Sequence, residues 1–201
     1  MLPLKQSPAN FAQLEDWLTP PERLAIAYAP KEMRAAWAGF LALERRLADA
    51  ARPEREPIMV QLRLAWWRDR FNEPASMWPI GEPLLALLAA WDNERGALAA
   101  LVDGFEARNV GSDGGRELDR AKVEGMAALA RLSGVKADAA VRLAAAQWLK
   151  LAPAPKALTK LPRAMRPLAI LRGMALRNER GQTGPPWREF LAILRLGLLG
   201  R

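Results

Sequence analysis

The chain has 201 residues, 51% of them hydrophobic and 26% charged, and a formal net charge of +8. These values fit one globular domain, residues 1–201, with a sizeable core. Cysteine and histidine are absent, which excludes disulfides, thiolate nucleophiles, imidazole bases and the common zinc ligands. The N-terminus lacks the apolar core of a secretory signal, and no run of ~18 uncharged apolar residues predicts a membrane span.

Helices dominate the predicted secondary structure, so we expect an all-α fold. Leu, Ala, Arg and Glu are abundant, and no run alternates apolar and polar residues like a half-buried strand. The glycine-rich cluster at 111–115 is the best internal break. In chain order, the predicted helices span residues 10–17, 21–28, 32–51, 57–71, 83–91, 97–108, 117–132, 137–151, 157–176 (interrupted at Pro162 and Pro167) and 187–199.

The helix at 57–71 is the one around which we expect the others to pack. Apolar side chains cover most of its circumference, and the polar ones form two narrow stripes, Gln61 with Arg68 and Arg63 with Arg70. A helix that is apolar on nearly all sides belongs inside a protein. An arginine buried there needs an anion or a carbonyl oxygen. We therefore predict a central helix whose arginines point at a partner.

Glu44 lies within the apolar face of the helix at 32–51. It is interpreted either as half of a structural ion pair with Arg63 or as a polar position in a cavity. Trp66 and Trp67 are interpreted as core residues rather than as rings that stack on a ligand. The other carboxylate pairs are typical of solvated helix surfaces and do not predict a metal site: Asp92 with Glu94, and Asp103 with Glu106.

Basic residues are concentrated at the C-terminal end. Residues 156–201 hold ten Lys or Arg and two acids, a net charge of +8 that equals the charge of the whole chain. This basic part is either a solvated face or a surface that meets anionic lipid or an acidic partner protein. Nucleic acid is not expected, because no recognition helix, zinc finger or aromatic RNA-binding signature accompanies the charge. The expected location is the cytoplasm, peripheral to the inner membrane.

Three segments resemble the squalene/phytoene synthase family. They are residues 28–44 (YAPKEMRAAWAGFLALE), 55–57 (REP) and 61–68 (QLRLAWWR). The resemblance is strong over 24–72 and returns weakly at 194–201 (LRLGLLGR), and it is closest to the divergent branch that includes respiratory complex I assembly factors. It implies the all-helical isoprenoid (prenyl-diphosphate) synthase fold, in shortened form, with a central cavity. Active members join two prenyl diphosphates head to head, using Mg²⁺ held by two aspartate-rich helical motifs.

Both of these metal motifs differ in this chain. Aligned with the family, Arg45 and Arg46 stand where the first motif has its paired aspartates, and Asp49 stands at the third position. Substituting guanidinium for carboxylate converts a cation site into an anion site. In the second motif only Gln147 matches, with Lys150 at the asparagine position and, at the arginine and aspartate positions, Pro153 and Ala154.

The resemblance therefore predicts a degenerate, non-catalytic member that acts as a membrane-associated binding or assembly factor, as in respiratory complex I assembly. The alternative is an active prenyltransferase with an altered metal site. No cofactor is expected, with Mg²⁺ required only by the alternative, and the expected ligand is an isoprenoid or a lipid. Candidates for a remnant cavity are Glu44, Asp49, Arg63 and Gln147, and candidates for contact with an anion or diphosphate are Arg45, Arg46 and Lys150.

Overall fold

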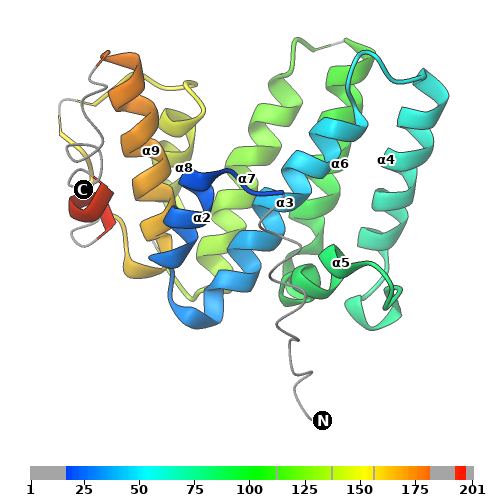
Figure 1. Cartoon of the computed structure of the whole chain (residues 1–201), viewed down its shortest axis with the longest axis horizontal. Coiled ribbons are helices and arrows are strands. Elements are labelled where there is room, and N and C mark those ends of the chain that lie inside the picture. Colours follow the sequence, from blue (N-terminus) through cyan, green and yellow to red (C-terminus); the bar gives the residue numbers. More distant parts are fainter. Residues whose placement is uncertain (1–16, 112, 137, 156, 182–192, 198–201) are drawn as a thin grey trace.

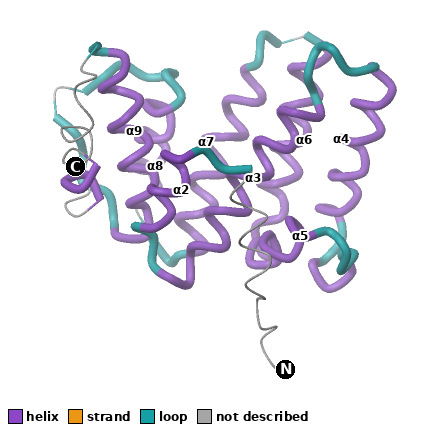
Figure 2. The backbone as a smooth tube through the Cα atoms, viewed as in Figure 1, coloured by secondary structure: helices purple, strands orange, loops and turns teal. Residues whose placement is uncertain are grey.

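The structure, a computed structural model, describes residues 17–111, 113–136, 138–155, 157–181 and 193–197. Every regular element in these ranges is helical (Figure 2), which confirms the predicted all-α class. The α-helices are α2 (Pro20–Ala27), α3 (Arg34–Ala50), α4 (Pro57–Asn72), α5 (Pro83–Leu88), α6 (Arg95–Val110), α7 (Arg116–Leu132), α8 (Asp138–Trp148) and α9 (Arg166–Glu179). Short 3₁₀ turns are η1 (Lys31–Met33), η2 (Ala75–Met77), η3 (Ala89–Glu94) and η4 (Arg163–Met165).

The predicted helices match these elements with two corrections near the C-terminal end. The helix predicted at 157–176 begins only at Arg166, and Pro167 lies in its first turn, where a proline does not interrupt a helix. The helix predicted at 137–151 ends at Trp148. The predicted helix at 10–17 lies almost entirely outside the described residues, as does most of 187–199, of which 193–197 is described and helical.

Five helices form a row in which each packs on the next: α4, α6, α7, α8 and α9. Of the remaining three, α2 contacts α9 and α3, α3 contacts α4, α6 and α7, and α5 packs on α3. In Figure 1, α7 lies in the middle of the row and α4 at its outer edge. The central positions therefore belong to α3 and α7.

Small residues allow the central helices to approach closely. A Cβ added at Gly104 of α6 would lie 2.6 Å from Leu118 Cα on α7. One added at Gly125 of α7 would lie 2.2 Å from the ring of Phe40 on α3. That ring is fully buried and stacks on Trp91 with 5.2 Å between centroids. The core is thus built from large side chains set against glycine and alanine.

The predicted central helix, α4, lies at the edge of the molecule, so that prediction is wrong. Its buried face, centred on Leu64 and Trp67, packs on α6. The opposite face is open, and Ile58, Leu62 and Trp66 are 58%, 58% and 39% exposed. Of the two tryptophans predicted to be core residues, only Trp67 is one.

Candidate functional site

Three residues aligned with the first metal motif line one surface groove. Arg45, Arg46 and Asp49 lie on the side of α3 opposite its buried residues, because α3 turns its large apolar side chains toward α5, α6 and α7. The groove has a volume of about 490 Å³. Its lining consists of Trp17, Leu18, Thr19, Arg45, Arg46, Ala48, Asp49 and Arg52.

Arg45 is bound by a carboxylate of α2. Its Nε and Nη2 donate to Glu22 at 2.9 Å each, in the two-pronged geometry that suits guanidinium and carboxylate. The hydrogen bond to Glu22 raises the pKa of Arg45. Glu22 is 8% exposed, and it also accepts from the backbone N–H and the hydroxyl of Thr19 at 2.7 Å each. The sequence analysis did not single out Glu22, although a threonine followed three residues later by a glutamate signals a helix start with this geometry.

Arg46 is the least neutralised guanidinium of the groove. Its Cζ lies 5.1 Å from the centre of the Trp17 ring, a cation–π distance. Glu82 Oε2, the nearest carboxylate oxygen described for it, is 4.0 Å away. The side chain is 47% exposed. An incoming anion could therefore reach Arg46 without first displacing a close ion pair.

Asp49 faces the same groove but is already paired with cations. Arg52 Nη2 lies 2.9 Å from one carboxylate oxygen, and Arg55 Nη2 lies 3.5 Å from the other. Both arginines precede α4 in the connection from α3. Asp49 is therefore paired with one arginine of the groove, Arg52, and with Arg55, which is not part of the lining.

The groove does not fit a magnesium–diphosphate site. Such a site needs several carboxylates that face one space, whereas this lining holds one aspartate and three arginines. Among the described residues, no group of three His, Cys, Asp or Glu side chains could hold a metal ion. A lining of guanidinium groups suits an anion such as a phosphate instead.

The residues aligned with the second metal motif are not in this groove. Gln147 of α8 is buried, and its Oε1 accepts a 3.4 Å hydrogen bond from Arg172 Nη1 of α9. Arg172 is only 1% exposed, and its Nη2 donates to the carbonyl oxygen of Thr159 at 2.8 Å. Burial lowers the pKa of Arg172, because only neutral oxygens face this guanidinium in the described part of the chain. A buried cation here disfavours a metal ion beside Gln147.

The other predicted residues of the second motif lie on the surface. Lys150 is exposed, has a positive φ of 62° just after α8, and lies 3.6 Å from Glu179 of α9. Pro153 and Ala154 are exposed in the connection to α9. Lys150 therefore does not share an anion site with Arg45 and Arg46. The sequence analysis missed Arg172, although its position directly after the apolar run 168–171 could have signalled a buried arginine.

Glu44 forms an ion pair, but with a different partner from the predicted one. Lys122 Nζ of α7 lies 2.6 Å from Glu44 Oε1, and the two side chains are 16% and 20% exposed. Arg63 lies on the exposed side of α4. The prediction of a Glu44–Arg63 pair is wrong because Arg63 lies on the open side of α4, whereas Lys122 of α7 reaches Glu44.

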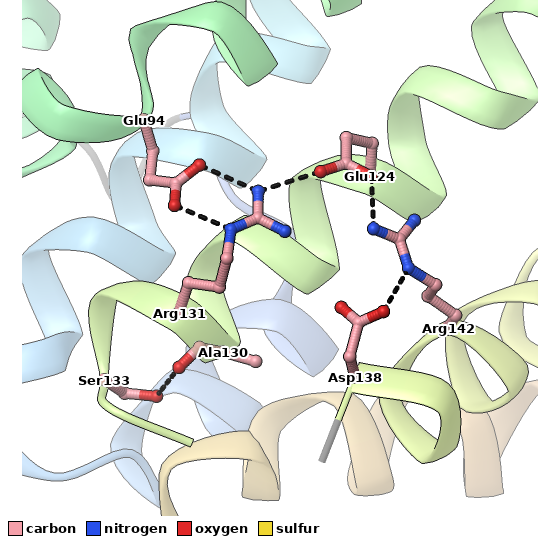
Figure 3. Close-up of polar contacts among 7 residues, drawn as sticks. All are labelled: Glu94, Glu124, Ala130, Arg131, Ser133, Asp138 and Arg142. Carbon is pink, nitrogen blue, oxygen red and sulfur yellow. Dashed lines mark hydrogen bonds and ion pairs between the residues drawn. The ribbon is translucent and has the colours of Figure 1, made fainter. Parts of the chain in front are cut away.

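The predicted surface carboxylate pairs bind arginines. Arg68 of α4 holds Asp103 and Glu106 of α6. Glu94 belongs to a network that joins η3, α7 and α8 (Figure 3), in which Arg131 donates to Glu94 and to Glu124 at 2.7–2.8 Å. Arg142 bridges Glu124 and Asp138 at 2.6 Å each. These carboxylates serve as structural links between helices.

Comparisons with protein-family models, with curated proteins and with solved structures returned no match. In the described ranges, no helix combines the length and apolar character needed to cross a bilayer. The functional case therefore depends on the residues themselves: an arginine-lined groove on α3 and a buried Gln147–Arg172 pair.

Proposed function

We propose that the chain is a non-catalytic protein of the squalene/phytoene synthase type that acts as a membrane-associated binding or assembly factor. One observation carries the proposal. Where the family places its first paired aspartates, this chain has Arg45 and Arg46 in an arginine-lined groove, and the remaining Asp49 is bound to Arg52. Ionising an allylic diphosphate needs cations that neutralise the leaving pyrophosphate, and guanidinium groups at this position repel such ions.

The same groove supports binding of an anionic headgroup. A phosphate or diphosphate could accept from Arg46, which is half exposed and has no close carboxylate partner in the described chain. Trp17 provides an apolar surface beside that guanidinium. An isoprenoid diphosphate and a phospholipid share this combination of a charged head and an apolar chain. Either could be the ligand.

The basic C-terminal part supports contact with an anionic membrane surface. Within its described portion, four of the basic side chains are exposed: Lys160, Arg163, Arg180 and Arg195. Each basic residue near an anionic lipid surface contributes ~1 kcal/mol of binding free energy. This attraction would hold the protein at a membrane without a spanning helix.

The test of the non-catalytic role is a condensation assay with farnesyl and geranylgeranyl diphosphate, with and without Mg²⁺. We expect no condensation product and no release of pyrophosphate. Binding of the unreacted diphosphate, measured by calorimetry, should weaken in Arg46→Ala. It should be unchanged in Arg120→Ala, an exposed arginine of α7 that serves as the matched control. Metal-dependent release of pyrophosphate by the wild type would establish the alternative, an active prenyltransferase.

The membrane role is tested by co-sedimentation with vesicles that contain phosphatidylserine. The double variant Lys160→Ala/Arg163→Ala should lose about 30-fold in vesicle affinity, since two basic residues are worth about 2 kcal/mol. The control Arg108→Ala/Arg120→Ala removes the same charge from exposed positions on α6 and α7. Equal losses in both double variants, or no binding by the wild type at low salt, would overturn the membrane role.

A further inference from the structure

The outer face of α4 carries a continuous apolar stripe. Ile58, Leu62 and Trp66 recur every four residues and are exposed on one side of the helix, with Met59 beside them at 43% exposure. The opposite side of the same helix is buried against α6. In the described structure α4 is therefore apolar on two opposite faces, of which only one has a neighbour. A contiguous exposed patch of this kind marks an interaction surface.

The charges around this stripe are balanced. The exposed or half-buried side chains that flank it comprise three acids and three arginines: Glu54, Glu56, Asp69, Arg55, Arg63 and Arg70. Arg68 lies on the other side of the helix, bound to Asp103 and Glu106. An anionic membrane would favour a net positive rim, and a strongly charged partner protein would favour a rim of the opposite sign. A balanced rim favours a partner whose own rim is balanced.

The charges just before α4 and in its last turns are self-complementary. Glu54 and Arg55 precede the stripe, and Asp69 and Arg70 follow it. If two copies of α4 pack antiparallel with Leu62 on the two-fold axis, the turn before each helix, with Glu54 and Arg55, comes beside the partner's last helical turns, with Asp69 and Arg70. Each copy then brings one acid and one arginine to an acid and an arginine of the other, so that Arg55 can pair with the partner's Asp69 and Glu54 with the partner's Arg70. A parallel pairing would instead place each charge against its own copy.

The existing contacts allow these pairs to form. Asp69 is exposed and has no ion pair in the described chain. Arg55 has only a 3.5 Å contact to Asp49, and Arg70 has a 3.4 Å contact to Glu73. The same antiparallel register puts Ile58 against the partner's Trp66, and large aromatic anchors of this kind carry much of the binding energy at interfaces.

We propose that α4 is the interface of a homodimer in which two copies of the helix pack antiparallel about Leu62. The proposal is independent of the anion groove on α3. It assigns a role to the apolar outer face of α4, which the proposed membrane function does not use. The partner is a second copy of this chain, because the stripe and its charges are complementary to themselves.

The natural absence of cysteine makes the register directly testable by cross-linking. Leu62→Cys should cross-link to its own copy with a short bis-maleimide, because position 62 lies on the two-fold axis. Leu143→Cys, which is also exposed but on α8, should not. Ile58→Cys and Trp66→Cys should cross-link efficiently only when the two variants are mixed. Equal yields for positions 62 and 143 would overturn the proposal.

Association in solution provides the second measurement. Light scattering on the wild-type chain over a range of concentrations should show a monomer–dimer equilibrium that Leu62→Glu weakens at least tenfold. Asp69→Arg should also weaken it, and adding Arg55→Asp in the same chain should restore it. Circular dichroism must show that each variant is folded. A monomeric wild type, or a dimer indifferent to Leu62→Glu, would overturn the proposal. Loss of vesicle binding in Leu62→Glu would also overturn it, because the stripe would then bind a membrane and not a second copy.

Discussion

Of α4 and α7, the more apolar helix is the less central one. α4 carries large apolar side chains on nearly all sides and lies at the edge of the molecule, whereas α7 is rich in alanine and charged residues and lies in the middle of the row (Figure 1). Gly125 lets α7 pack directly on Phe40 of α3. α4 packs mainly on α6, touches α3 less, and leaves its opposite face open. Closeness of approach, rather than the amount of apolar surface, determines which helix is central.

The largest expected effect contrasts the two faces of α4. Leu64→Ala removes a side chain that is 1% exposed, and we expect a loss of about 2–5 kcal/mol in unfolding free energy. Leu62→Ala, half a turn away on the open face, should change the free energy by less than about 0.5 kcal/mol. Urea denaturation at dilute concentration, where a dimer would dissociate, measures both. Equal losses in the two variants would mean that both faces of α4 are buried, and that α4 is not an edge helix.

The second prediction concerns the closest approach in the row of helices. In Gly104→Ala the new Cβ would lie 2.6 Å from Leu118 Cα and 2.9 Å from its backbone nitrogen, so α6 and α7 must separate. We expect a loss of about 1–3 kcal/mol. Gly96→Ala, in the first turn of the same helix, meets nothing within 4 Å and should be neutral or slightly stabilising. The melting temperatures of the two variants distinguish the cost of the steric clash at position 104 from the effect of glycine-to-alanine substitution on helix propensity.

The sequence was sufficient to predict the helices and most of their limits, because proline and glycine punctuate them and no stretch has strand periodicity. It was not sufficient to predict which helix is central. The apolar circumference of α4 suggested the interior, but glycine contacts such as that of Gly125 with Phe40 are visible only once two helices are placed together. The pairing of Glu44 followed from that error, because Lys122 and Arg63 are equally plausible partners until α7 and α4 are positioned.

The α3 groove was predicted in part. Alignment with the family metal motif located Arg45, Arg46 and Asp49, and these residues do line one groove. Trp17 of the groove and Glu22, which binds Arg45, come from other segments of the chain, and only the folded arrangement brings them to α3. Gln147 was found by motif, but its hydrogen bond with Arg172 depends on how α8 packs against α9.

The third prediction uses the corrected ion pair to compare α7 with α4. Glu44→Ala leaves the ammonium of Lys122, which is 16% exposed, without its carboxylate. We expect a loss of about 1–2 kcal/mol, less than for a fully buried pair because both side chains retain some contact with water. Arg63→Met, on the open side of α4, should leave the denaturant midpoint nearly unchanged. The double variant Glu44→Ala/Lys122→Met should recover part of the loss, and no recovery would mean that the two groups are not coupled.

The smallest expected effect is a dependence on pH that comes from the polar side of α7. Desolvation raises the pKa of Glu124, but hydrogen bonds from Arg131 and Arg142 outweigh it and hold the pKa below its usual value of 4.5 (Figure 3). A carboxyl whose pKa is lower in the folded state stabilises the fold above its unfolded pKa. This stabilisation is lost as the pH falls through the folded value. The stability of the wild type should therefore decrease as the pH drops below about 4.5.

Glu124→Gln should be less stable than the wild type at neutral pH and should lose less stability on acidification, because the amide does not titrate. We expect the difference to stay below about 1 kcal/mol, since a third of the Glu124 side chain is exposed and water screens the pair. Glu117→Gln, which changes an exposed carboxylate of the same helix outside this network, is the matched control. Denaturant midpoints of the wild type and both variants, measured from neutral to acid pH, test this expectation. If the stability of Glu124→Gln falls as steeply with decreasing pH as that of the wild type, the links from α7 to η3 and α8 do not depend on this carboxylate. Packing against α3 and α6 would then be what keeps α7 central.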